Sequence, residues 1–470
     1  MIAGLRRVTG RRTGGAPPMR LEVPGRRVNS IAMAFARIRD SLGVLPRAAF
    51  TVWVAAVWTG CSAPEQSVSG SSTTSESTSE STSESLTGGV STAGASTSEA
   101  PTTTSPPIDA TALRNVDVSV IYPLPQADEV ESLLAATDPG NGGPLLPQAL
   151  FAGGVPELDE RAPLADDAAR LAALRVVAVR FDPCPGELAP PPAGTVCQPD
   201  IRLVFQSLMP GPTGMLARDG ALHGFYRLTP SEFAAVLGEL RDIRAEHLSD
   251  PETPLDVHPL LLSTGLEGAY AQRLGALLVK YAGPATLVRV TEFRRLDTPE
   301  VRWVFSLKEK PEGTWQNMQI STTGVTEEEL VTIVGGVWNA VLTPPVSHPD
   351  DVTKIFSLSD PAEMAAAFTA VVRVLHPGVH SSESIDCATC HIAPDVAVFA
   401  SSTLSLDVAD DPERFTSSYP LDFVGKSVGD SIDFENMHMM SYLGGSLSIT
   451  ARVANETAAA LEIIQGEYGE

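Results

Sequence analysis

Residues Cys387-Ala388-Thr389-Cys390-His391 are the most informative stretch of this 470-residue chain. The chain contains only five cysteines and eight histidines, so two cysteines and a histidine rarely meet within five positions. A random arrangement of the same residues would produce a C-x-x-C-H sequence about once in a thousand chains. The stretch therefore points to a chemistry that needs two thiols and an imidazole at this spacing.

C-x-x-C-H is the attachment sequence of c-type haem. The thiols of Cys387 and Cys390 would form thioethers with the haem, and His391 would be the proximal ligand of the iron. Two residues between the cysteines let both sulfurs reach one edge of the porphyrin, and the histidine that follows can turn beneath the iron. The sequence therefore predicts one covalently bound haem c.

Three other interpretations of these residues stay open. Cys387 and Cys390 would also suit a disulfide or a thioredoxin-like redox pair. They would also suit half of a zinc site, because His376 and His380 lie just upstream and could complete a Cys2His2 set. The compartment in which the chain folds bears on this choice.

The first sixty residues have the charge and hydropathy of an export signal. They carry ten arginines against Glu22 and Asp40, a net charge of +8, whereas the whole chain has a net charge of −24. Ala48–Trp58 is an apolar run that is too short to span a bilayer but has the length of a signal-peptide core. We expect residues 1–60 to be a signal region, with Met33 as an alternative start.

The apolar run ends in Val57-Trp58-Thr59-Gly60-Cys61, which resembles the signal of bacterial lipoproteins. The resemblance implies that Cys61 is diacylated and anchors the mature protein to a membrane surface without a spanning helix. The alternative is an ordinary secretory signal in which Cys61 has no role. Both signals export the chain, and haem c is attached outside the bacterial cytoplasm. We expect a membrane-anchored protein on the periplasmic side or at the outer membrane.

Residues 61–107 form the expected link between this anchor and the folded body. From Ser67 to Pro107 the chain is rich in Ser, Thr, Glu, Gly and Pro and lacks large apolar residues, so it is predicted to be a disordered tether. The acidic net charge argues against nucleic acid as a partner, because phosphate binding needs a positive field. A partner steered by charge would be basic.

Residues 108–344 are predicted to form an α+β domain whose role the sequence does not reveal. The capping box Thr229-Pro230-Ser231-Glu232 starts one helix, and a second is predicted over 266–282. Cys184 and Cys197 enclose a loop rich in Pro and Gly, and in an exported protein they are predicted to form a disulfide. Runs of β-branched residues bounded by turns predict strands over 116–123, 174–182, 201–206, 285–294, 301–307 and 315–321.

Residues 345–470 hold five of the eight histidines. A helix is predicted from Pro361 to His376, and a final helix over 448–465. The order of helix, C-x-x-C-H, later methionines and final helix resembles class I c-type cytochromes. The resemblance implies a mostly helical, cytochrome c-like module with one distal iron ligand. A methionine there would raise the reduction potential, and a histidine would lower it. The candidates are Met437, Met439, Met440, His376, His380 and His438, and the alternative is an open distal site that would bind peroxide or a gas.

The sequence thus predicts an exported lipoprotein that transfers single electrons to an unidentified redox partner protein. One alternative is a partner-binding or gas- or redox-sensing lipoprotein with a structural haem or zinc site. Another is a peroxidase-like enzyme.

Overall fold

The computed structural model describes residues 112–469, apart from residues 152, 162, 184–197, 247–252, 298, 336, 347 and 426–434. The predicted signal region, the predicted tether, Cys61 and the predicted disulfide between Cys184 and Cys197 lie outside the described residues. All described residues belong to one compact unit, Ala100–Glu470.

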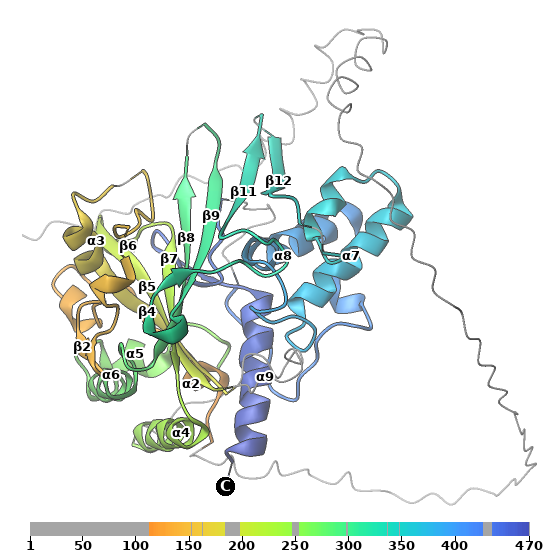
Figure 1. The fold of residues 1–470 in the computed structure, drawn as a ribbon. Helices are drawn as coiled ribbons and strands as arrows, with labels where there is room; N and C mark the ends of the chain where they lie inside the picture. Colours follow the sequence, from red (N-terminus) through yellow and green to blue (C-terminus); the bar gives the residue numbers. More distant parts are fainter. Residues whose placement is uncertain are drawn as a thin grey trace, which may run out of the picture. The chain divides into compact units, whose positions relative to one another are not determined.

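A ten-stranded antiparallel sheet is the centre of the fold (Figure 1). Eight strands follow the order β1-β4-β5-β7-β8-β9-β11-β12, while β6 pairs with β5 and β10 pairs with β9. The strands are β1 (Ser119–Ile121), β4 (Leu174–Asp182), β5 (Asp200–Gly211), β6 (Gly214–Ala217), β7 (Ala221–Arg227), β8 (Leu287–Leu296), β9 (Arg302–Glu309), β10 (Gln316–Asn317), β11 (Glu327–Val334) and β12 (Val337–Thr343).

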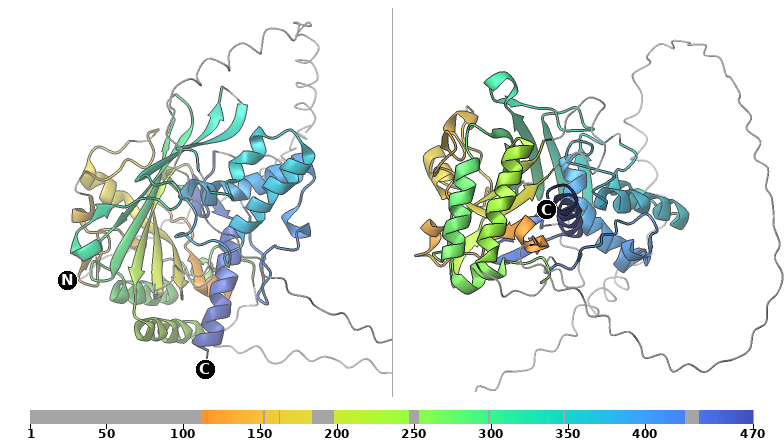
Figure 2. Two further views of the ribbon diagram at one scale, coloured as in Figure 1. Left: turned by 45° about the vertical axis from the view of Figure 1, so that its right-hand side comes forward. Right: turned by 90° about the horizontal axis from the view of Figure 1, so that it is seen from below.

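Helices cover both sides of this sheet. Figures 1 and 2 show α4 and α6 on one side and α7, α8 and α9 on the other. Two small hairpins, β2–β3 (Pro139–Gly140 and Gly143–Pro144) and β13–β14 (Met440–Leu443 and Ser446–Ile449), lie outside the large sheet. The helices are α2 (Asn115–Val118), α3 (Asp167–Ala173), α4 (Pro230–Ala245), α5 (Pro259–Thr264), α6 (Ala269–Tyr281), α7 (Pro361–Leu375), α8 (Cys387–Phe399) and α9 (Ala451–Glu467).

Side-chain alternation along β8 gives the two faces of the sheet different surroundings. Arg289 and Thr291 line a cavity beneath α8, whereas Glu292 and Arg294 line a separate cleft. Successive side chains of a strand point to opposite faces, so the cavity and the cleft lie on opposite sides of the sheet.

Several predicted elements are confirmed. Strand β4 has the predicted bounds, and α4 begins with the predicted capping box, in which Thr229 and Glu232 each accept a backbone hydrogen bond from the other. Helix α7 begins at Pro361, where Asp360 caps it. The predicted strand over 116–123 is shorter in the structure, because residues 115–118 form α2 and only residues 119–121 form β1.

The predicted fold class is wrong. The structure is dominated by one large antiparallel sheet, and residues 345–470 do not form a mostly helical, cytochrome c-like module. Their helices pack on the sheet instead: Arg180 of β4 donates hydrogen bonds at 2.8 Å to Val453 O and Thr457 Oγ1 of α9. The resemblance to cytochromes was based on the order of elements along the chain, which carries no information about what each helix packs against.

Candidate functional site

The C-x-x-C-H sequence forms the beginning of α8, whose first residue is Cys387. Asp386 caps this helix, because its carboxylate accepts a hydrogen bond at 2.7 Å from the backbone N–H of Thr389. Residues three positions apart lie on one face of a helix, so Cys387 and Cys390 point in similar directions. Both are half-buried free thiols, and no disulfide joins them.

Both cysteines and His391 line one cavity between α8 and the sheet. The cavity measures about 120 Å³. Strands β4, β5, β7, β8 and β9 provide a wall that is partly apolar and partly cationic. The apolar residues are Val204, Phe225 and Leu307, and the cationic ones are Arg180, Arg202 and Arg289.

His391 is held in one orientation. Its Nδ1 lies 2.7 Å from the carbonyl oxygen of Met437, and a carbonyl only accepts, so Nδ1 carries the proton and donates it. The rings of Phe293 and Phe305 each lie 5.1 Å from the imidazole. Histidines that bind metals through Nε2 are commonly oriented by such an Nδ1–H bond to a backbone carbonyl. The tautomer of His391 is therefore the one that an iron ligand needs.

The thiols are poor nucleophiles where they lie. Burial raises the pKa of the Cys390 thiol to about 11, and burial together with Glu328 raises the pKa of Cys387 well above its usual value. Catalytic redox cysteines need the opposite, a lowered pKa that yields the thiolate at neutral pH. The surroundings therefore disfavour the thioredoxin-like interpretation.

Two buried carboxyl groups lie at the start of α8. Glu328 of β11 accepts a hydrogen bond at 3.1 Å from the backbone N–H of Ala388, and Asp386 lies beside it. Burial and the nearby Asp386 raise the pKa of Glu328 to about 9, so Glu328 is protonated at neutral pH.

The predicted distal methionines occupy different positions. Met439 and Met440 line the same cavity as the cysteines and His391. Met437 does not line it: its side chain is buried in the core, and its carbonyl oxygen anchors His391. Two of the three predicted methionines are thus brought to the cavity, and the third has a positioning role.

The predicted histidine ligands do not line this cavity. His376 accepts a hydrogen bond at 3.0 Å from the backbone N–H of Gly378, and His380 bonds to Asp350 at 2.7 Å. His438 is completely buried, with Nδ1 2.8 Å from Ser441 Oγ. The Cys2His2 zinc set is therefore not assembled by the described residues.

Sequence reasoning missed two polar residues of the cavity wall. His223 lies on β7, and burial, with His391 and Arg202 nearby, lowers its pKa well below the usual value. Arg202 lies on β5 with its guanidinium 4.7 Å from the ring centre of Phe225, and its Nε has no hydrogen-bond partner among the described residues. Residues 221–227 show no apolar/polar alternation that would have revealed β7, in which His223 and Phe225 lie on one face.

The side chains that line this cavity are of the types that would hold haem c. Two thiols share one helix face, the next residue is a histidine protonated at Nδ1, and two thioethers lie across the cavity. With a volume of about 120 Å³ the cavity is too small for a porphyrin, and the long side chains of Arg202, Arg289 and Met439 are among those that line it. Haem c is attached to unfolded exported chains, so the group would be in place before these walls close around it.

A second cluster, formed by His348, Asp350 and His380, is the one group of possible metal ligands found among the described residues, with ligand atoms within 4.8 Å of one another. Its carboxylate is already engaged, because Arg373 Nε lies 2.9 Å from the same Asp350 oxygen that bonds His380. Lys354 and Arg452 donate to the carbonyl oxygens of His348 and His380. Three cations disfavour a metal ion here, so the cluster is best described as an ion-pair network beside α7.

No protein family model matches the chain, and no curated protein or solved structure is significantly similar to it. Within the described part of the chain, no helix has the length and apolar character needed to cross a bilayer.

Proposed function

We propose that this protein binds one haem c through Cys387, Cys390 and His391 and carries single electrons at a membrane surface. A haem supplies one-electron redox chemistry, and the protein provides its ligands, its electrostatic surroundings and access for a partner. The observation that carries this proposal is the orientation of His391, whose Nδ1–H donates to Met437 O at 2.7 Å while the same helical turn presents both thiols to one cavity.

The competing interpretations have less support. A redox-active dithiol would need a lowered thiol pKa, and burial raises the pKa of both cysteines. A zinc site would need His376 or His380 beside the thiols, and both histidines are engaged away from the cavity.

The cellular setting follows from the N-terminal sequence. Diacylated Cys61 anchors the protein to a membrane on the periplasmic side or at the outer membrane. The partner is a redox protein that presents a basic face, because the chain has a net charge of −24. Nucleic acid is not a partner of so acidic a chain.

The test is a pyridine haemochrome spectrum of the full chain, produced together with haem-maturation machinery. We expect the spectrum of a haem with both vinyl groups saturated, and we expect it to disappear in the variant Cys387→Ala/Cys390→Ala. Thr389→Ala is the matched control, because it changes the same helical turn and keeps the C-x-x-C-H spacing. A wild-type protein that carries no covalent haem under these conditions would overturn the proposal.

A further inference from the structure

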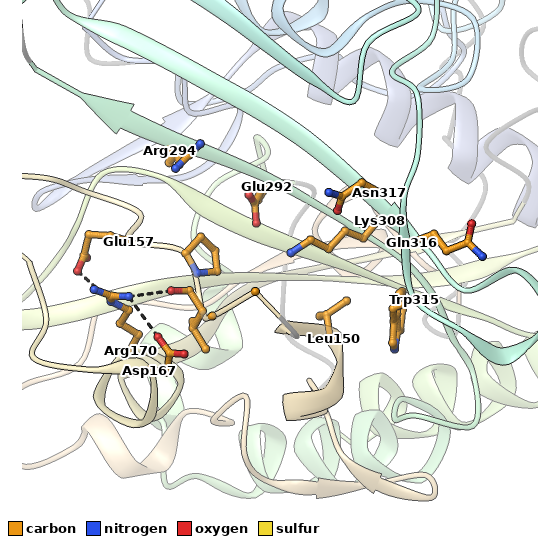
Figure 3. Close-up of a pocket in the computed structure, with 14 residues that line it drawn as sticks. Leu150, Glu157, Asp167, Arg170, Glu292, Arg294, Lys308, Trp315, Gln316 and Asn317 are labelled. Carbon is orange, nitrogen blue, oxygen red and sulfur yellow. Dashed lines mark hydrogen bonds and ion pairs between the residues drawn. The ribbon is translucent and has the colours of Figure 1, made fainter.

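A large cleft lies on the face of the sheet opposite the cysteine-lined cavity. It measures about 700 Å³ and is formed by β8, β9, β10, α3 and the loop after Phe151 (Figure 3). Because neighbouring residues of β8 point to opposite faces, Glu292 lines the cleft while Thr291 lines the cavity. The cleft is therefore separate from the proposed haem site and does not depend on it.

At one end of the cleft, the charged side chains form ion pairs and hydrogen bonds with one another. Arg170 bonds Glu157 at 3.1 Å, Asp167 at 3.2 Å and the carbonyl oxygen of Val155 at 3.0 Å. Figure 3 shows these side chains directed at one another. The charged groups at this end are therefore already paired and offer few hydrogen bonds to a ligand.

The other end combines an aromatic ring with amides. Trp315 lies beside Gln316 and Asn317, and Leu150 lies near it on the cleft floor (Figure 3). Lys310 lies 6.0 Å from the centre of the Trp315 ring, a cation–π contact that holds the indole in place. This end places one partly buried indole beside two side-chain amides in a cleft whose lining is otherwise mostly polar.

Between these two ends lie two charged side chains that can still form hydrogen bonds with a ligand. Glu292 makes no ion pair or side-chain hydrogen bond with the described residues, and Lys308 makes only a cation–π contact, 5.4 Å from the ring centre of Phe151. They are diagonal neighbours, since Lys308 pairs with Val290 and Glu292 pairs with Ser306. A ligand here meets an acceptor and a donor side by side.

The charges that line the cleft balance. Three are basic and three are acidic: Arg170, Arg294 and Lys308, and Glu157, Asp167 and Glu292. A strongly charged ligand gains nothing from a neutral cleft, and an apolar ligand would desolvate these groups without replacing their hydrogen bonds. A polyhydroxylated ring suits it, because hydroxyls both donate and accept while the aliphatic face of the ring packs on an indole.

We propose that this cleft binds a short saccharide, with one sugar ring on Trp315 and hydroxyl groups bonded to Glu292, Lys308 and Asn317. The edge of the indole would give one apolar contact, and the polar side chains that make up most of the lining would bond the hydroxyls. A saccharide-binding cleft on one face and a haem on the other would place an electron carrier at a glycan-rich surface.

The test is isothermal titration calorimetry of the full chain with chitotetraose, cellotetraose and maltotetraose. We expect at least one of them to bind with a Kd of about 1 mM or lower. Trp315→Ala and Glu292→Gln should each weaken that binding at least about tenfold, because one removes the stacking surface and the other the charged acceptor. The control Leu262→Ala, which alters an exposed side chain of α5 outside the cleft, should leave binding unchanged.

Two results would overturn the proposal. One is the absence of binding heat with all three sugars; if tetra-alanine, titrated in parallel, then binds, the cleft is a peptide site. The other is saccharide binding that Trp315→Ala and Glu292→Gln both leave intact. The variant Cys387→Ala/Cys390→Ala separates this proposal from the haem proposal, since it removes the haem attachment and should keep saccharide affinity.

Discussion

At the scale of single residues, the sulfur ligand of the proposed haem can be narrowed to two side chains. Met439 and Met440 both line the cavity that contains His391. Met440 is buried at the first position of β13, and Met439 is half-buried just before that strand. Met439 lies in a bend and Met440 begins the strand, so the two side chains approach the cavity from different backbone conformations.

We expect one of the variants Met439→Ala and Met440→Ala to lower the haem reduction potential, since loss of a thioether ligand removes its stabilisation of ferrous iron. The same variant should convert the iron from low spin to high spin. Potentiometry and absorption spectra of both variants check this. Met437→Leu is the control, because its backbone carbonyl still anchors His391. Unchanged potential and spin state in both alanine variants would rule out methionine as the distal ligand.

At the scale of elements, the contact between β11 and the start of α8 is sensitive to pH. Glu328 of β11 is completely buried and accepts a hydrogen bond from Ala388 at 3.1 Å. Its pKa is raised to about 9 by burial and by Asp386, against a usual value of 4.5. The folded state thus keeps a proton that the unfolded state releases, so folding stability falls as pH rises between about pH 5 and pH 9.

Glu328→Gln should remove this loss, because the amide resembles the protonated acid and can still accept from Ala388. Relative to wild type, the free energy of unfolding of Glu328→Gln should increase with pH, by at most about 1.4 kcal/mol per pH unit. Urea denaturation at several pH values measures it. Glu327→Gln, at the exposed neighbour on β11, is the matched control. A difference that stays constant with pH would show that Glu328 is not protonated in the folded state.

At the scale of the whole molecule, a buried ion-pair group ties the sheet to the C-terminal helix. Arg180 of β4 pairs with Glu456 of α9, and Arg452 bonds the same carboxylate at 2.7 Å. Nearby cations hold the pKa of Glu456 well below its usual range despite burial. These contacts join β4 and α9, which lie almost three hundred positions apart in the sequence. Helix α9 therefore packs against the sheet as part of the same folded unit.

Arg180→Met should destabilise the protein by about 3 kcal/mol, because it removes a buried guanidinium that bonds α9 and leaves the half-buried Glu456 carboxylate with one cation fewer. Unfolding should remain a single transition, since α9 and the sheet lose their contacts together. Urea denaturation followed by tryptophan fluorescence and by circular dichroism measures both quantities. Lys280→Met, which breaks the exposed pair with Glu239, should leave stability almost unchanged. Separate transitions for the two probes would contradict a single cooperative unit.

The elements that could be predicted are those with strong local signals. Strand β4 is a continuous β-branched run, and α4 and α7 begin with a capping residue followed by proline. Strand β11 was missed because Glu327-Glu328-Glu329 interrupts its apolar pattern, and β12 was missed although its sequence contains no charged residue. Their burial depends on partners elsewhere in the chain, and no local pattern encodes it.

The sequence by itself determined the identity and spacing of the proposed attachment residues, because Cys387, Cys390 and His391 lie within five positions of one another. Only the tertiary structure decided which distant residues meet them: Met439 rather than His376, together with Arg202 and His223 from strands near the middle of the chain. It also decided that the C-terminal helices cover a sheet instead of forming a module of their own. Local spacing follows from the geometry of one helical turn, whereas long-range pairing depends on burial and register that involve the whole chain.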